Sequence, residues 1–158
     1  MTVLVAGIGN VFLGDDGFGS EVARELGQVM LPPDVTVVDY GIRGMHLAYD
    51  LLAGYDGLVL VDALPRNGSP GDIHVLEVGP DDVGTAALDA HGMTPTDVLA
   101  GLGQLGGHLP RTFVVGCEPG NLEEHIGLSE PVADAVPRAV DAVLALLTSE
   151  LGVPVRKG

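Results

Sequence analysis

The chain is short of cysteine, of basic residues and of long apolar runs, and each shortage excludes a class of protein. Cys117 is the only cysteine in 158 residues, so neither an intrachain disulfide nor a zinc site made of several cysteines can form. Only 7 Lys and Arg stand against 22 Asp and Glu, for a formal net charge of -15. This balance argues against nucleic acid or an anionic membrane as the partner. The excess of acidic residues favours the binding of cations or of a basic segment of a partner, or it serves solubility alone.

No apolar stretch is long enough to cross a bilayer, and Val3–Ala6 is too short for a signal peptide and lacks a charged lead. We therefore expect a cytoplasmic protein. The length fits one domain, residues 1–158, with a core of its own. We expect this domain to act as a monomer.

The most informative stretch lies at the start of the chain, where an apolar run leads into glycines and two carboxylates. Thr2–Ala6 is rich in β-branched residues and predicts a strand buried on both faces. Gly7 and Gly9 allow a sharp turn after it. Asp15 and Asp16 follow, and then apolar residues recur with helical spacing at Phe18, Val22, Leu26 and Val29.

Three interpretations of this stretch remain open from the residues alone. A dinucleotide-binding turn fits poorly, because Phe12 stands where the third glycine belongs and the two carboxylates would repel a pyrophosphate. A cation site built on carboxylates is the second interpretation. In the third, Asp15 and Asp16 simply cap the helix that follows.

The rest of the chain alternates between predicted strands and helices. The predicted strands are 35–39, 57–63, 73–78 and 111–117, and the predicted helices are 44–53, 94–105 and 131–151. In the helix 44–53, Met45, Ala48 and Leu52 share one face. Pro137 either kinks the last helix or marks its true beginning. Residues 153–158 are predicted to form a loose tail.

This alternation predicts an α/β fold, a three-layer sandwich with a mostly parallel five-stranded sheet and helices on both faces. Strand 73–78 is the exception, because its apolar residues alternate and only residues 64–71 separate it from the strand before. That link is too short for a helical crossover, so this strand is predicted to be an antiparallel edge.

Titratable side chains are expected at the edge of the sheet where the parallel strands end, which is where such folds bind ligands. They are Asp16, Asp39, Asp62, His91 and Glu118. A receiver domain also gathers acids there, but it needs a lysine after the fifth strand, and the only lysine is Lys157.

Asp62 gives the sharpest signal, because a carboxylate at the end of a Leu-Val-Leu-Val run is costly to bury unless it is paired or liganded. Together, Asp16, Asp62 and His91 offer two oxygens and one nitrogen to a divalent first-row metal and leave coordination positions open. The alternatives are that Asp62 caps a loop and that His91 is a surface histidine. Cys117 is either a nucleophile paired with His91 or His125, or an inert buried thiol.

With Gly7-Ile-Gly-Asn10, Gly14-Asp-Asp-Gly17, Asp62 and His91 placed, the chain resembles the hydrogenase maturation endopeptidases. The likeness extends over nearly the whole length and includes Gly116-Cys-Glu-Pro119 and Leu122-Glu-Glu-His-Ile-Gly-Leu128. Members of that family trim the C-terminus of the large subunit of nickel-iron hydrogenases.

The resemblance implies a nickel-contacting trio at Asp16, Asp62 and His91. It also implies that the nickel is carried by the large-subunit precursor and that cleavage follows nickel insertion. The nickel would polarise the scissile carbonyl or activate a water, with a carboxylate as base, or it would only position the tail. A non-enzymatic metal- or nucleotide-binding module is the alternative function. The loop Asp39-Tyr-Gly-Ile-Arg-Gly44 differs from the same loop of many relatives, which have a glycine and a threonine around Gly41 and Ile42. Arg43 in this loop is a candidate contact for the precursor.

Overall fold

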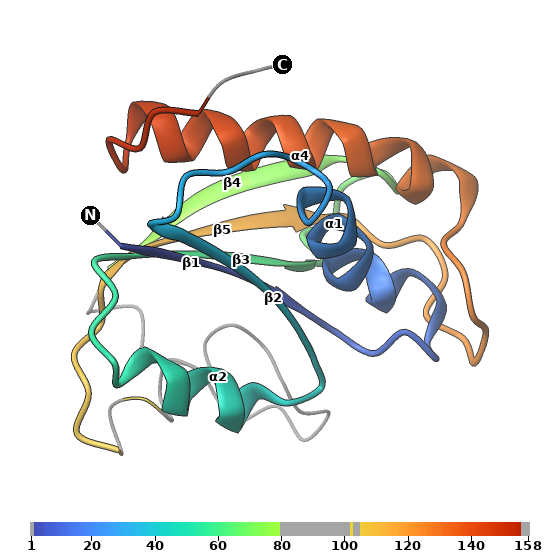
Figure 1. Ribbon diagram of the computed structural model, residues 1–158. Helices are drawn as coiled ribbons and strands as arrows, with labels where there is room; N and C mark the ends of the chain where they lie inside the picture. The colour runs from blue at the N-terminus through green and yellow to red at the C-terminus, as the bar shows by residue number, and fades with distance from the viewer. Residues whose placement is uncertain (1, 80–101, 103–104, 156–158) are drawn as a thin grey trace.

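The computed structural model of the chain describes residues 2–79, 102 and 105–155. Its centre is one five-stranded sheet, with helices α1 and α4 on one face and α2 on the other (Figure 1). The strands are β1 (Val3–Ile8), β2 (Val35–Gly41), β3 (Gly57–Ala63), β4 (Ile73–Val78) and β5 (Arg111–Cys117). The helices are the 3-10 turn η1 (Gly14–Gly17), α1 (Phe18–Leu26), α2 (Gly44–Leu51) and α4 (Glu130–Ser149).

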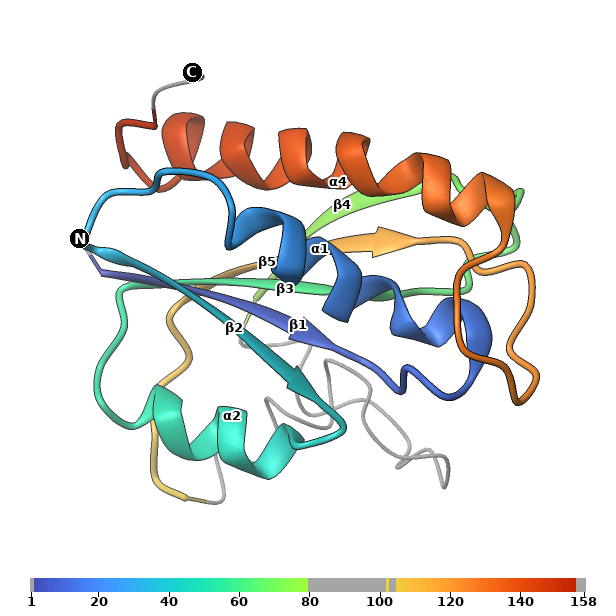
Figure 2. The ribbon, with the colours of Figure 1, turned by 45° about the vertical axis from the view of Figure 1, so that its right-hand side comes forward.

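The strand order is β2-β1-β3-β5-β4, and only β4 runs antiparallel to its neighbour. The predicted fold class is therefore confirmed, including the antiparallel edge strand. Although a short link joins β3 and β4, they are not neighbours in the sheet, because β5 lies between them. The carboxyl ends of β1, β2, β3 and β5 meet at one edge, and Figure 2 shows the β1–α1 connection at that edge.

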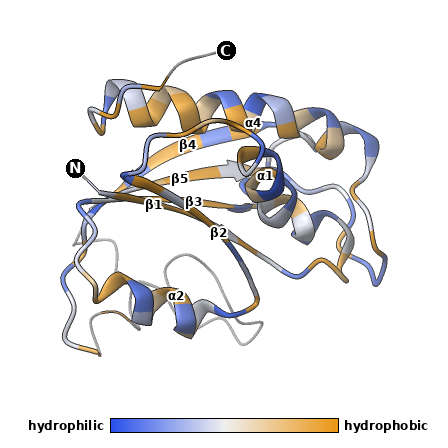
Figure 3. Ribbon diagram, in the orientation of Figure 1, coloured by the Kyte–Doolittle hydropathy of each residue, from blue (hydrophilic) through white to orange (hydrophobic). Residues whose placement is uncertain are grey.

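Successive side chains of each strand point to opposite faces of the sheet, so the hydrophobic core has two parts, one on each face. Val59 and Val61 of β3 pack with α1 and α4, whereas Leu58 and Leu60 pack with α2. Every residue of β3 is buried, which explains the unbroken apolar run in its sequence, and Figure 3 shows the central strands as the most hydrophobic part of the sheet. Asp62 is the one charged residue in this strand.

Of the three residues that the sequence places on one face of α2, only Ala48 is buried. Leu47, Ala48 and Leu51 are buried, while Met45 is 62% exposed and Leu52 is 42% exposed. The helix carries apolar residues on two sides, so its periodicity alone could not decide which side packs on the sheet. The predicted helix 94–105 lies almost wholly outside the described residues.

Two further predictions about the C-terminal region are settled. Pro137 lies inside α4, which begins at Glu130, so it does not mark the start of the helix. The prediction of a loose tail from residue 153 is wrong at its first residue, because Val153 is 4% exposed and its N–H donates to the carbonyl of Leu147 (2.7 Å). No helix in the described ranges is both long and apolar enough to cross a membrane.

Candidate functional site

Asp16 is positioned by the turn that follows β1. Gly9 has a φ of 135° and its N–H donates to the carbonyl of Gly41 (2.8 Å), which ends the strand and turns the chain away. The N–H of Asn10 then donates to Oδ2 of Asp16 (2.8 Å). The carboxylate is thus held against the end of β1, half-buried, in the turn η1 that leads into α1.

Asp62 is the last residue but one of β3 and lies beside the same glycine, and its exposure is only 5%. A Cβ at Gly9 would collide with the carbonyl oxygen of Asp16 and would lie 3.5 Å from Oδ1 of Asp62. Glycine is therefore required where the turn and the Asp62 side chain meet.

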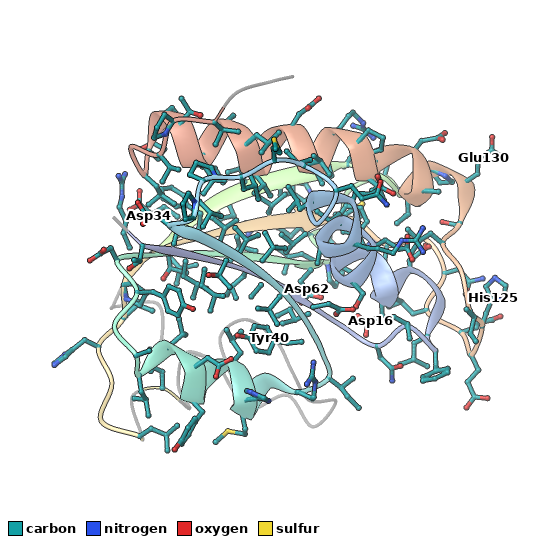
Figure 4. The ribbon with its side chains drawn as sticks, in the orientation of Figure 1. Asp16, Asp34, Tyr40, Asp62, His125 and Glu130 are labelled. Carbon is teal, nitrogen blue, oxygen red and sulfur yellow. The ribbon has the colours of Figure 1, made fainter. Side chains whose placement is uncertain are left out.

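The two carboxylates influence one another. Burial first, and then the negative charge of Asp16, raise the pKa of Asp62 well above its ordinary value, against the smaller effect of a backbone hydrogen bond from Ala63. Figure 4 shows Asp16 and Asp62 close together at the carboxyl end of the sheet. Two like charges in a site with little solvent repel each other, so a cation or a shared proton would stabilise the pair.

His91, the third residue of the predicted trio, lies outside the described residues. Within the described ranges no three His, Cys, Asp or Glu side chains are arranged to hold a metal ion. Asp16 and Asp62 are thus an incomplete ligand set by themselves.

Asp39 and Glu118, also predicted at this edge, are engaged by other groups. Oδ1 of Asp39 accepts hydrogen bonds from the hydroxyl of Ser20 (2.7 Å) and from the N–H of Gly41 (3.0 Å). Oε2 of Glu118 accepts one from the N–H of Arg66 (2.7 Å) and lies 3.7 Å from Nε2 of His74. Asp39 therefore fixes the end of β2, and Glu118 fixes the β3–β4 link.

Asp15 has a role that the sequence did not reveal. It is fully buried, and its carboxylate accepts hydrogen bonds from four groups on a loop more than 100 residues away. The donors are the N–H groups of Gly120 (2.8 Å), Asn121 (2.8 Å) and Ser129 (2.7 Å) and the hydroxyl of Ser129 (2.7 Å). Burial acts to raise the pKa of Asp15, but these bonds together hold it below its ordinary value.

The backbone completes this connection. The N–H of Asp15 donates to the carbonyl of Asn121 (2.8 Å), and the N–H of Gly14 donates to that of His125 (2.7 Å). Asp15 therefore anchors the loop 120–129 to η1, and so fixes the turn that carries Asp16.

Cys117 has the properties of an inert thiol. It is fully buried, and burial raises its pKa from 9.0 to about 11. Its Sγ lies 3.7 Å from the carbonyl oxygen of Glu118. A thiol that stays protonated at neutral pH is a poor nucleophile.

An open hollow of about 420 Å³ is lined in part by Gly9, the glycine that lies beside Asp16 and Asp62. It is lined by the β1–η1 loop, including Gly9, Asn10 and Phe12, and by the β2–α2 loop, including Ile42 and Arg43. Phe12 and Ile42 are each 64% exposed. The guanidinium of Arg43 donates to the carbonyls of Asp39 (2.9 Å) and Tyr40 (3.2 Å). The loops beside the carboxylate pair thus present exposed apolar side chains.

Comparison with known proteins gives consistent matches. A protein-family model described as hydrogenase maturation protease matches residues 20–146. The hydrogenase 2 maturation protease of Escherichia coli (strain K12) is 34% identical over 154 residues, which cover 93% of this chain and 91% of that protein.

Solved structures give the same result. The hydrogenase maturating endopeptidase HybD from E. coli superposes with a TM-score of 0.83 at 34% identity, over 97% of this chain and 95% of that one. The hydrogenase 2 maturation peptidase from a Thaumarchaeota archaeon superposes with a TM-score of 0.74 at 32% identity, over 95% of this chain and 100% of that one.

Proposed function

Because the chain belongs to the hydrogenase maturation protease family, we propose that it removes a C-terminal extension from the large-subunit precursor of one nickel-iron hydrogenase. Membership makes the chain an endopeptidase, a hydrolase acting on peptide bonds. A non-enzymatic binding module is set aside, because these matches are described as proteases or peptidases.

The observation that carries the finer proposal is the pairing of Asp16 with Asp62. A buried carboxylate whose pKa is raised by burial and by a second carboxylate is unfavourable unless a positive charge joins it. Oxygen donors of this kind, together with an imidazole, suit a divalent first-row metal. We propose that this metal is the nickel of the precursor and that His91 is the third contact.

The incomplete ligand set supports a metal that arrives with the substrate. Two carboxylates hold a divalent ion weakly by themselves. Nickel-free precursor would therefore gain little binding free energy at the site, whereas nickel-loaded precursor would gain the binding free energy of the metal contacts. This difference in affinity would restrict cleavage to the loaded form. Arg43 and the exposed Phe12 and Ile42 border the adjoining hollow and would contact the precursor around the metal.

The chemical step requires a water to attack the scissile carbonyl, the C–N bond to break, and the proton taken from the water to be passed to the leaving amine. With nickel bound, Asp16 is the better base of the two carboxylates, because it is half-buried and reachable, whereas Asp62 is 5% exposed. In this proposal Asp62 holds the metal, and Asp16 contacts it and accepts the proton of the attacking water.

The test is an incubation of the purified protein with nickel-loaded and nickel-free precursor from the same source, followed by mass spectrometry of the precursor C-terminus. We expect loss of one short peptide from the loaded form only. Asp16→Asn, Asp62→Asn and His91→Ala should each abolish the cut.

Asp34→Asn is the matched control, because Asp34 is an exposed carboxylate that lies away from the Asp16–Asp62 pair in Figure 4. It should cut at the wild-type rate. Equal cutting of loaded and nickel-free precursor would refute the nickel requirement, and full activity in Asp62→Asn would refute the proposed site.

A further inference from the structure

A second hollow lies on the other side of η1, between α1 and the first half of α4. It is a groove of about 710 Å³, and residues 126–128 are part of its lining. Its walls are largely apolar, with Val29 from the turn after α1 and Val136 and Val140 from α4. At its rim, Ile126 is 69% exposed and Val11 is 40% exposed. Apolar side chains left open to solvent in a concave surface are typical of binding sites.

The groove is also acidic. Glu21 and Glu25 of α1 line one side, and Asp141 of α4 lines the other. Arg24 lies 4.0 Å from Glu21, but its side chain is 70% exposed, so the pair neutralises little of this charge. An occupant that matches the groove therefore carries both apolar and basic side chains.

The groove and the hollow beside Gly9 share a lining residue. Gly14 and Gly17, the two ends of η1, line the groove, and Asp16 lies between them in the chain. Val11 lines both the groove and the hollow beside the carboxylates. A chain segment that leaves the carboxylate pair can thus enter the groove by crossing Val11.

We propose that this groove binds the C-terminal extension of the precursor, on the far side of the scissile bond. The inference rests on the proposed function. The body of the precursor is a folded protein too large for a groove of about 710 Å³, whereas a short extended segment fits. The extension would place apolar side chains against Val136 and Val140 and at least one lysine or arginine near Glu25 and Asp141.

Two pairs of variants test the inference by steady-state cleavage of nickel-loaded precursor. Ala133→Trp fills the groove, and Ala145→Trp makes the same change at an exposed position of α4 that does not line it. Asp141→Lys reverses a groove charge, and Asp34→Lys makes the same change of net charge at the exposed Asp34, away from the groove.

We expect kcat/KM to fall about tenfold or more in Ala133→Trp and Asp141→Lys, mainly through KM, because the groove contacts are made in both ground and transition states. The two control variants should stay within about twofold of the wild type, the order of change left by a surface substitution outside the contacts. Circular dichroism and thermal unfolding of each variant separate a folding defect from lost binding.

A precursor whose extension is cut back to the first few residues after the scissile bond completes the test. Wild type and Ala133→Trp should cut it at equal, lowered efficiency. A difference that persists with the short extension would assign the groove to the precursor body and overturn the inference. Equal cutting of full-length precursor by Ala133→Trp and wild type would overturn the inference alone. No cutting by the wild type would overturn the proposed function and the groove inference with it.

Discussion

Replacing Asp15 by Asn should destabilise the protein without touching the carboxylates proposed to contact the nickel. In the folded chain, Oδ2 accepts three hydrogen bonds and Oδ1 accepts one. An asparagine amide that keeps its oxygen at the Oδ2 position turns its NH2 towards the N–H of Ser129, so two donors face each other and that bond is lost. The other three bonds lose the assistance of the negative charge.

The size of the effect follows from these losses. One lost bond to a buried donor costs about 1–3 kcal/mol, and three weakened bonds cost about 1 kcal/mol each, against a smaller cost of burying an amide than a carboxylate. We expect a net loss of about 2–4 kcal/mol in the free energy of unfolding, or a Tm lower by roughly 5–15 °C. Ser129→Ala, which removes only the hydroxyl donor, should cost about 1 kcal/mol.

Urea unfolding at pH 7 is the assay, with Asp16→Asn as the control. The Asp16 carboxylate accepts one backbone bond, from Asn10, and its loss should cost less than about 1.5 kcal/mol. The folded pKa of Asp15 lies below the ordinary value of 3.8, so its contribution is present above that pH and is lost as the pH falls through the lowered pKa. The gap between wild type and Asp15→Asn should therefore close in acid. Unfolding of Asp15→Asn at the wild-type urea concentration would refute the reasoning.

Three further predictions concern the site and the core. Asp62→Asn should abolish cleavage of the precursor. The free energy of unfolding at pH 7 should stay the same or rise by up to about 1 kcal/mol, because the substitution removes a buried charge that Asp16 repels. A clear destabilisation in urea would contradict this. Cys117 has a pKa raised to about 11, so the folded chain keeps a proton that the unfolded chain releases above about pH 9. Stability should fall from pH 9 towards 11 in the wild type and less in Cys117→Ala, and identical pH profiles would argue against the buried thiol. Gly9→Ala should cost about 2 kcal/mol or more and abolish cleavage, because its Cβ collides with the carbonyl of Asp16. Gly54→Ala is the control, because Gly54 also has a positive φ (93°) but no atom lies within 4 Å of the added Cβ. This variant should lose about 1 kcal/mol of stability and still cut the precursor. An equal loss of stability in both variants would show that backbone strain rather than the collision is responsible.

The sheet could be predicted from the sequence because its signals are local. Continuous apolar runs identify β1, β3 and β5 as strands covered on both faces, and the short link before β4 rules out a parallel crossover. Asp62 could be selected for the same reason, since a single charge in a buried strand is visible without knowledge of its neighbours.

Other features depend on partners far along the chain. Asp15 and Asp16 are adjacent carboxylates in one turn, and nothing local distinguishes the one that anchors a loop from the one that faces Asp62. The difference comes from donors on residues 120–129, which only the fold brings to Asp15. The packed face of α2 could not be predicted from periodicity, because large apolar residues occur on two of its sides, and the sheet selects Leu47 and Leu51 rather than Met45. His91 stays a prediction.

The position of β5 between β3 and β4 has a consequence for the newly made chain. As the ribosome releases β3 and then β4, each strand lacks its native neighbour on the side that β5 will occupy, because β5 has not yet been made. The 39 residues that follow Val78 and end at Cys117 take roughly 2–8 s to synthesise at about 5–20 residues per second. For that time β3 presents an apolar edge with unpaired N–H and C=O groups. This interval is when we expect the chain to be most prone to aggregation and most in need of a chaperone.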